Sequence, residues 1–84
     1  MYVVLVYDFD EERVQRINKL LKGYLIWVQN SVFEGEITNS LYDEMVKRMA
    51  KLMKEEDSVI IYRFKSKNGV ERELCGEIRD LNVI

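Results

Sequence analysis

The feature that most limits how this chain can fold is an apolar run at its start, YVVLVYD, which fits a β-strand at 2–8 by its length and its valine and tyrosine content. Side chains alternate along a strand. Both sides are apolar here, with Tyr2, Val4 and Val6 on one and Val3, Leu5 and Tyr7 on the other. The run DSVIIYRFK predicts another strand at 58–65 with the same character. A sheet built on these strands has no face suited to water.

Between and after these strands the pattern predicts two helices, a hairpin and a short last strand. The expected elements are a helix at 10–22 that stops at Gly23, hairpin strands at 25–29 and 32–37, a helix at 40–54 capped by Thr38 or Ser40, a turn at 66–69 and a strand at about 73–78. This order predicts an α+β fold, the ferredoxin-like βαββαβ sandwich, as a single domain over 1–84. Its antiparallel sheet carries both helices on one face.

The second face of that sheet needs a cover that two helices cannot supply. A second copy of the sheet, packed face to face about a two-fold axis, would provide it. Each additional buried Val or Ile contributes about 1.5–3 kcal/mol, and a chain of 84 residues has little surface to bury by itself. The sequence therefore predicts a homodimer through the open face.

The residue types that are scarce exclude several kinds of chemistry. The chain has no histidine and one cysteine, Cys75, which excludes catalysis by Ser-His or Cys-His pairs, an internal disulfide and a zinc site of the usual ligands. We expect Cys75 to be buried and inert. Any acid-base or metal chemistry must therefore use carboxylates. The absence of a long apolar run, of the basic flank of a signal peptide and of a disulfide framework predicts a cytoplasmic protein with no membrane partner. The net charge of −2 gives no global attraction to nucleic acid or to an anionic membrane, so any such binding must come from local patches.

Asp8 follows the first strand and shares a side with Val4 and Val6. If that side is the dimer face, two copies of Asp8 could meet near the axis, where facing carboxylates would suit a hard divalent cation such as Mg²⁺. The alternative is that Asp8 is only the N-cap of the following helix, the more common role for an Asp at this place. Asp10 would serve that cap equally well.

Basic residues recur at helical spacing along the first helix. Arg13, Arg16, Lys19 and Lys22 form a slanting stripe with no acid among them. Such a stripe can hold a phosphate backbone without reading bases, or it can be a solvated helix face. Trp27 and Phe33 could likewise stack on bases, although aromatic residues in strands more often belong to the core.

Four segments in order, VVLVYDFD, ERVQRINKLLKGY, VQNSVFEGEIT and DSVIIYRF, resemble the small CRISPR-associated proteins of spacer acquisition, the Cas2 family. The resemblance implies a ferredoxin-like homodimer whose C-terminal strand reaches across to the partner. It also implies a metal-dependent endonuclease that acts on RNA or duplex DNA. The family's metal-binding and catalytic aspartate falls on Asp8.

The same resemblance assigns supporting roles to other positions. The tyrosine next to the family's aspartate matches Tyr7, basic positions match Arg13 and Arg16, and the serine and phenylalanine of its hairpin match Ser31 and Phe33. Many relatives carry an arginine where this chain has Trp27.

Two hypotheses follow, and both can hold. In the first, the dimer is a Mg²⁺-dependent phosphodiesterase in which Asp8 holds the metal and Arg13, Arg16 and Lys19 bind nucleic acid. In the second, suggested by the family, it is a DNA-binding adaptor that bridges dimers of the CRISPR integrase and needs no chemistry at Asp8. A ligand-sensing domain would call for a glycine-rich turn, and the four glycines are too scattered to form one.

Overall fold

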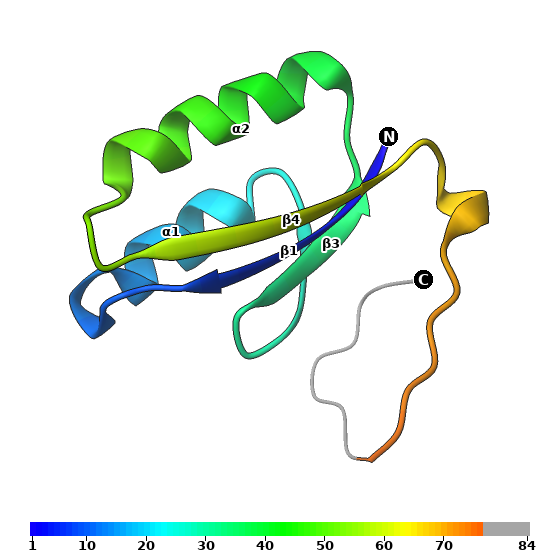
Figure 1. The fold of residues 1–84 in the computed structure, drawn as a ribbon, viewed down its shortest axis with the longest axis horizontal. Helices are drawn as coiled ribbons and strands as arrows, with labels where there is room; N and C mark the ends of the chain where they lie inside the picture. The colour runs from blue at the N-terminus through cyan, green and yellow to red at the C-terminus, as the bar shows by residue number, and fades with distance from the viewer. Residues whose placement is uncertain (77–84) are drawn as a thin grey trace.

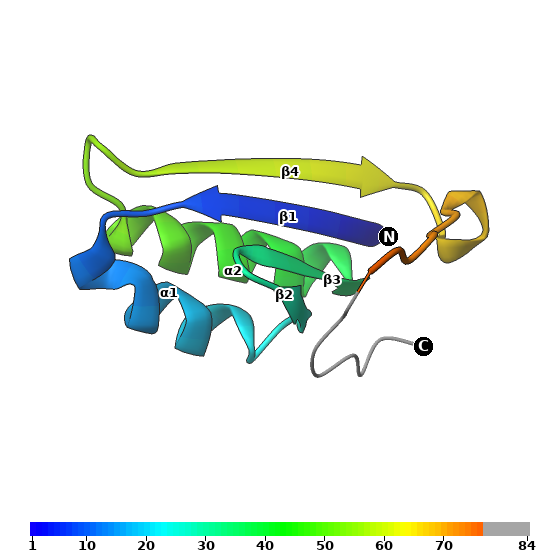
Figure 2. The same cartoon turned by 90° about the horizontal axis from the view of Figure 1, so that it is seen from below.

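The computed structural model describes residues 1–76 and has the predicted order of elements from the first strand to the strand predicted at 58–65 (Figure 1). These are β1 (Tyr2–Asp8), the short 3₁₀ helix η1 (Glu11–Arg13), α1 (Val14–Leu21), β2 (Ile26–Gln29), β3 (Val32–Glu36), α2 (Asn39–Leu52), β4 (Ser58–Phe64) and a 3₁₀ turn, η2 (Lys67–Gly69). The strands pair antiparallel in the order β2-β3-β1-β4. Both helices lie on the same side of the sheet (Figure 2). The predicted α+β, ferredoxin-like class is confirmed.

The covered face of the sheet, which lies against the helices, holds the core. Residues directly opposite each other on paired strands share a face, so the register places Trp27, Phe33, Leu5 and Ile61 in one row. The side chains that are buried almost completely within residues 1–76 are Phe33, Leu5, Ile17, Leu21, Met45 and Val3. Half of these come from α1 and α2 at helical spacing, which is why both helices pack on this face.

The open face is also apolar, as predicted, but no helix of residues 1–76 covers it. Its central row is Ile26, Glu34, Val4 and Tyr62, and the next row contains Val32, Val6 and Ile60. Ile60 is 55% exposed and Tyr62 is 54% exposed. A contiguous set of exposed apolar side chains on a sheet is typical of an interaction surface.

A carboxylate interrupts the open face and is satisfied from two sides. Glu34 is buried; the Tyr2 hydroxyl donates to its Oε2 at 2.8 Å, and the Nε of Arg72 lies 3.1 Å from its Oε1. Burial and the bond to Glu34 raise the pKa of the Tyr2 phenol. The segment after β4 is thus tied to the central row of the open face by an ion pair.

Three local expectations need correction. The first helix begins with a 3₁₀ turn, so α1 proper starts at Val14. Cys75 is exposed, because the chain around it lies away from the core instead of forming a buried strand. Of the strand expected at about 73–78, residues 73–76 form no strand within this single chain, and the rest lies outside the described residues.

The hairpin and the second cap agree with expectation. Asn30 has a φ of 45° in the turn between β2 and β3, a left-handed conformation that asparagine tolerates well. Thr38 caps α2 by accepting a hydrogen bond from the backbone N–H of Leu41 at 3.1 Å. Among residues 1–76, no helix combines the length and the apolar character that crossing a bilayer requires.

Candidate metal and nucleic-acid site

Asp8 is the last residue of β1 and lies opposite Ser58 of β4. It is exposed on the open face, at the end of the alternation that places Val4 and Val6 there. Within residues 1–76 its carboxylate makes no hydrogen bond or ion pair. In that part of the chain, Asp8 is therefore a free acceptor beside an apolar surface.

The helix cap belongs to Asp10, so the interpretation of Asp8 as an N-cap is wrong. Oδ1 of Asp10 accepts a hydrogen bond from the backbone N–H of Glu12 at 3.0 Å. Asp10 is the right distance along the chain because β1 ends at Asp8 and the first helical turn starts at Glu11. This arrangement leaves Asp8 available for another role.

The described part of one chain does not form a metal centre. Within residues 1–76, no three Asp, Glu or Cys side chains come close enough to hold an ion. Mg²⁺ is commonly held by one or two carboxylates, with water and phosphate oxygens completing its shell. The donor set therefore fits this ion only if a second carboxylate, such as Asp8 of another copy, joins the first.

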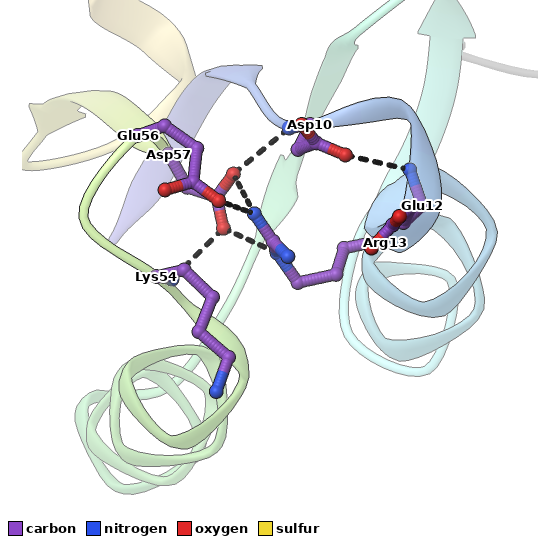
Figure 3. A network of polar contacts seen from close by, with 6 residues as sticks. All are labelled: Asp10, Glu12, Arg13, Lys54, Glu56 and Asp57. Carbon is purple, nitrogen blue, oxygen red and sulfur yellow. Dashed lines mark hydrogen bonds and ion pairs between the residues drawn. The ribbon is translucent and has the colours of Figure 1, made fainter.

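Asp57, just before β4, is the centre of a dense polar network at the same end of the sheet (Figure 3). Its side chain is fully buried and forms an ion pair with Arg13, whose Nε lies 2.7 Å from Oδ2. Arg13 also donates through Nη2 to Oε1 of Glu56 at 2.5 Å. Arg13 and backbone N–H groups hold the pKa of Asp57 well below its usual range, and the acids raise the pKa of Arg13.

The network of Asp57 separates Arg13 from the other basic residues of the first helix. Arg13 was expected on an exposed helix face, but it is only 8% exposed because η1 turns it toward Asp57. Arg16 and Lys19 are exposed and line a groove of about 410 Å³ between α1 and α2. Arg48 reaches the same groove from α2, and Leu20 and Leu52 form part of its lining. The structure thus brings Arg16 and Lys19 together with Arg48 but separates them from Arg13.

Two of the supporting residues, Tyr7 and Phe33, lie on the covered face of the sheet, opposite to the face that carries Asp8. Tyr7 is buried on the covered face, where its hydroxyl donates to Oδ1 of Asn18 at 2.5 Å, and burial raises the pKa of this phenol. Phe33 is completely buried beside it. Ser31 contributes a backbone carbonyl, which accepts from the N–H of Tyr7 at 3.1 Å.

Of the two aromatic residues that could stack on bases, Phe33 cannot do so because it is completely buried. Trp27 is half-buried in the row of Phe33, donates to the carbonyl of Asn30 at 2.9 Å and lies 5.8 Å from the Nζ of Lys22. The core interpretation is confirmed for Phe33, whereas Trp27 is partly buried and packs against the core. Tyr7 and Phe33 pack in the core on the covered face and hold in place the strand that carries Asp8.

Sequence reasoning did not identify Asp57, Glu34 or Arg72. A usable signal existed for Asp57, because β1 and β4 are antiparallel neighbours and the end of one meets the beginning of the other. An acid that directly precedes β4 must then lie near the turn that carries Arg13. No comparable signal exists for the pairing of Glu34 with Arg72, which depends on the path of the chain after β4.

Across residues 1–76, the fold and this site define a ferredoxin-like α+β protein with an unpaired carboxylate on an apolar sheet face and exposed cations on its helices. The family model for CRISPR associated protein Cas2 matches residues 1–71. The chain belongs to the Cas2 family.

Individual relatives and structures agree with this assignment. CRISPR-associated endoribonuclease Cas2 of Pyrococcus furiosus is 48% identical over 84 residues, which cover 93% of this chain and 99% of that protein. CRISPR-associated endoribonuclease Cas2 2 of Archaeoglobus fulgidus is 44% identical over 77 residues, covering 90% and 84%. A solved crystal structure of cas2 aligns with a TM-score of 0.90 at 45% identity, covering all of this chain and 95% of the other. Cas2 of Streptococcus pyogenes aligns at 0.71 and 29% identity, covering 87% and 99%.

Proposed function

We propose that this chain is a Mg²⁺-dependent endonuclease of CRISPR immunity that hydrolyses phosphodiester bonds in RNA or DNA as a homodimer. The observation that carries the proposal is Asp8, a carboxylate that has no partner within residues 1–76 and lies at the end of a bare apolar face. The names of the curated relatives, which are called endoribonucleases, support the reaction class. The site of action is expected to be the cytoplasm, where nucleic acid is accessible.

The homodimer is needed to complete the site. Two open faces that meet about a two-fold axis would bury Ile60 and Tyr62 and remove their apolar surface from water. Since Asp8 lies on the same face, the axis could bring two copies of it to one place. One carboxylate from each subunit would then meet the requirement of Mg²⁺ that a single chain does not meet.

Each protein group has a limited task in this scheme. The two Asp8 carboxylates would hold the cation, which when bound would supply activated water and neutralise negative charge on the phosphate. Arg16 and Lys19 attract and orient the backbone of the nucleic acid without reading its sequence. Tyr7 and Phe33 keep β1 in place through the core.

An Asp8→Asn variant tests this function, because asparagine is nearly isosteric and carries no charge. We expect it to lower kcat for Mg²⁺-dependent cleavage by about a hundredfold or more and to leave the dimer intact. Asp43→Asn, which removes an exposed carboxylate from α2, is the matched control and should cleave like wild type. Cleavage that is equal in wild type and Asp8→Asn would overturn the proposal and indicate a contaminating nuclease.

The groove between the helices favours a second role, that of a DNA-binding adaptor. In this role the dimer holds duplex DNA on Arg16 and Lys19 and bridges dimers of the CRISPR integrase during spacer acquisition. Duplex binding should then be tight and salt-sensitive, unchanged by Asp8→Asn and abolished in an Arg16→Glu, Lys19→Glu double variant. Duplex binding that survives this charge reversal would contradict the adaptor role.

A further inference from the structure

We propose that Arg13 is a positioning residue, which directs Asp8 through Asp57 instead of contacting phosphate. This deepens the function proposed above for Asp8 and rests on it. It also separates Arg13 from Arg16, although both lie in the same basic stripe of the sequence.

The first observation is how completely Asp57 is engaged. Its Oδ1 accepts from the backbone N–H of Asp10 at 2.8 Å and from Nη2 of Arg13 at 3.0 Å. Its Oδ2 accepts from Nε of Arg13 at 2.7 Å and from the backbone N–H of Lys54 at 2.9 Å. Figure 3 shows these bonds converging on one carboxylate from the turn after β1 and the turn before β4.

The second observation is where this carboxylate lies along the two strands. Asp10, whose N–H it binds, is two residues after Asp8 in the chain. Ser58, which follows Asp57 directly, is the residue opposite Asp8 in the sheet. The chain that follows Asp8 and the strand residue opposite Asp8 are therefore both connected to the buried ion pair of Asp57 with Arg13. We therefore expect a change in that pair to shift the end of β1 and, with it, the direction of the Asp8 side chain.

The third observation is that Arg13 has little left to offer a phosphate. Its side chain is 10% exposed, and it forms ion pairs with Asp57 and Glu56. An approaching phosphate would meet these two carboxylates as well as the guanidinium, so like charges would repel it. Arg16, one turn along the helix, is exposed and makes no ion pair within residues 1–76. The two arginines therefore have different partners and different tasks.

The experiment compares Arg13→Gln with Arg16→Gln in the full-length dimer. Binding to a short labelled duplex is measured by fluorescence anisotropy over a range of salt concentrations, without Mg²⁺ so that no cleavage occurs. The slope of log K against log salt should fall in Arg16→Gln by about one for each phosphate that Arg16 neutralises in wild type. It should stay unchanged in Arg13→Gln. An equal fall in both variants would place Arg13 on the phosphate and overturn the proposal.

A second arm measures cleavage by Arg13→Gln, Asp57→Asn and the double variant. If Arg13 acts through Asp57, each single change lowers kcat by about tenfold or more with KM nearly unchanged, and the double variant is no worse than the poorer single variant. Arg13→Lys keeps the charge but cannot form the same two-bond geometry, so it should restore only part of kcat. Effects that multiply in the double variant would show that the two residues act independently, which contradicts the proposal.

A third arm follows the cation directly and covers the case of a variant that loses stability. Mn²⁺ is titrated into each folded variant, confirmed by circular dichroism, and free Mn²⁺ is read by electron paramagnetic resonance. Asp57→Asn and Arg13→Gln should weaken Mn²⁺ binding about tenfold, whereas Arg16→Gln should not. If wild type neither cleaves nor binds Mn²⁺, the function proposed for Asp8 fails. The salt slopes still decide in that case whether Arg13 contacts phosphate.

Discussion

The two faces of the sheet are built from the same kinds of residue but differ in how far their side chains are buried. On the covered face Phe33 and Leu5 are completely buried under two helices, whereas on the open face Ile60 and Tyr62 are more than half exposed. Residue type does not explain this difference, because both sides of β1 and β4 are apolar. The difference comes from the path of the chain, which returns to the same side of the sheet after β1 and after β3 (Figure 2). The open face is therefore the one that no helix of residues 1–76 covers, and Asp8 lies at its end.

Two carboxylates at one end of the sheet also differ in how far they are enclosed. Asp57 is enclosed by four hydrogen bonds, while Asp8, at the same end of the sheet, has none within residues 1–76. An enclosed carboxylate holds structure together, and a free one at a surface can bind a ligand. This contrast separates the enclosed acid, Asp57, from Asp8, the acid for which we propose metal binding, more clearly than their positions in the sequence do.

The largest effect is expected when one aromatic residue is truncated on each face of the sheet. Phe33→Ala should lower the free energy of unfolding by about 3–5 kcal/mol, since it leaves a cavity in a filled core. Tyr62→Ala, measured by urea unfolding in protein dilute enough to separate the subunits, should lower it by less than about 1 kcal/mol. Equal losses in dilute protein would mean that the two faces are packed alike within one chain.

The next test places a charge on the open face. Ile60→Arg should raise the dissociation constant of the proposed homodimer by about a hundredfold or more, or about 3 kcal/mol, because it would bury an unpaired cation. Ala50→Arg adds the same side chain to the exposed side of α2 and should leave association unchanged. Sedimentation velocity over a range of protein concentrations measures both. A dimer that survives Ile60→Arg would have to use another surface.

A smaller effect is expected where the open face carries a buried acid. Arg72→Ala removes the cation from Glu34 and should lower the free energy of unfolding by about 1–3 kcal/mol, since the carboxylate is left buried with the Tyr2 hydroxyl and no charge to balance its own. Glu34→Gln in the same chain removes the unbalanced charge and should restore most of the stability. Thermal unfolding measures both variants. Failure of Glu34→Gln to rescue would show that Arg72 acts through packing alone.

The smallest effect concerns the enclosed acid and depends on pH. The pKa of Asp57 is lowered in the folded chain, so the folded state binds fewer protons there than the unfolded state does. Its contribution to stability is complete above the ordinary aspartate pKa of about 3.9 and is lost as pH falls below it. Wild type should therefore lose stability more steeply than Asp57→Asn as the pH falls below about 4. Parallel curves from acid titrations of urea unfolding would contradict the buried ion pair.

Much of the fold could be predicted because it depends on local patterns. The alternation in β1, the helical spacing of Ile17 and Leu21 and the turn at Asn30 each act over a few residues, and the structure has all three. Boundaries were less certain at the first helix, where Asp10 starts a 3₁₀ turn before α1. Such an end depends on what the turn packs against, which here is Asp57.

The site could be predicted only in part. The location of Asp8 at the end of a strand and on the less covered face follows from counting along β1. The burial of Arg13 does not, because its partner is 44 residues away in the sequence. A helical stripe of cations looks uniform in sequence, and only a long-range contact distinguishes the member that is neutralised from those that face solvent.

The amino-acid sequence by itself determined that this chain forms a sheet with two apolar faces and two helices, and that its first strand ends in an acid. Short-range sterics and side-chain alternation are enough for that result. Tertiary structure alone decided which acid is enclosed and which is free, and which arginine faces solvent. These outcomes depend on contacts between the turns at one end of the sheet, because these contacts join residues that are far apart in the sequence.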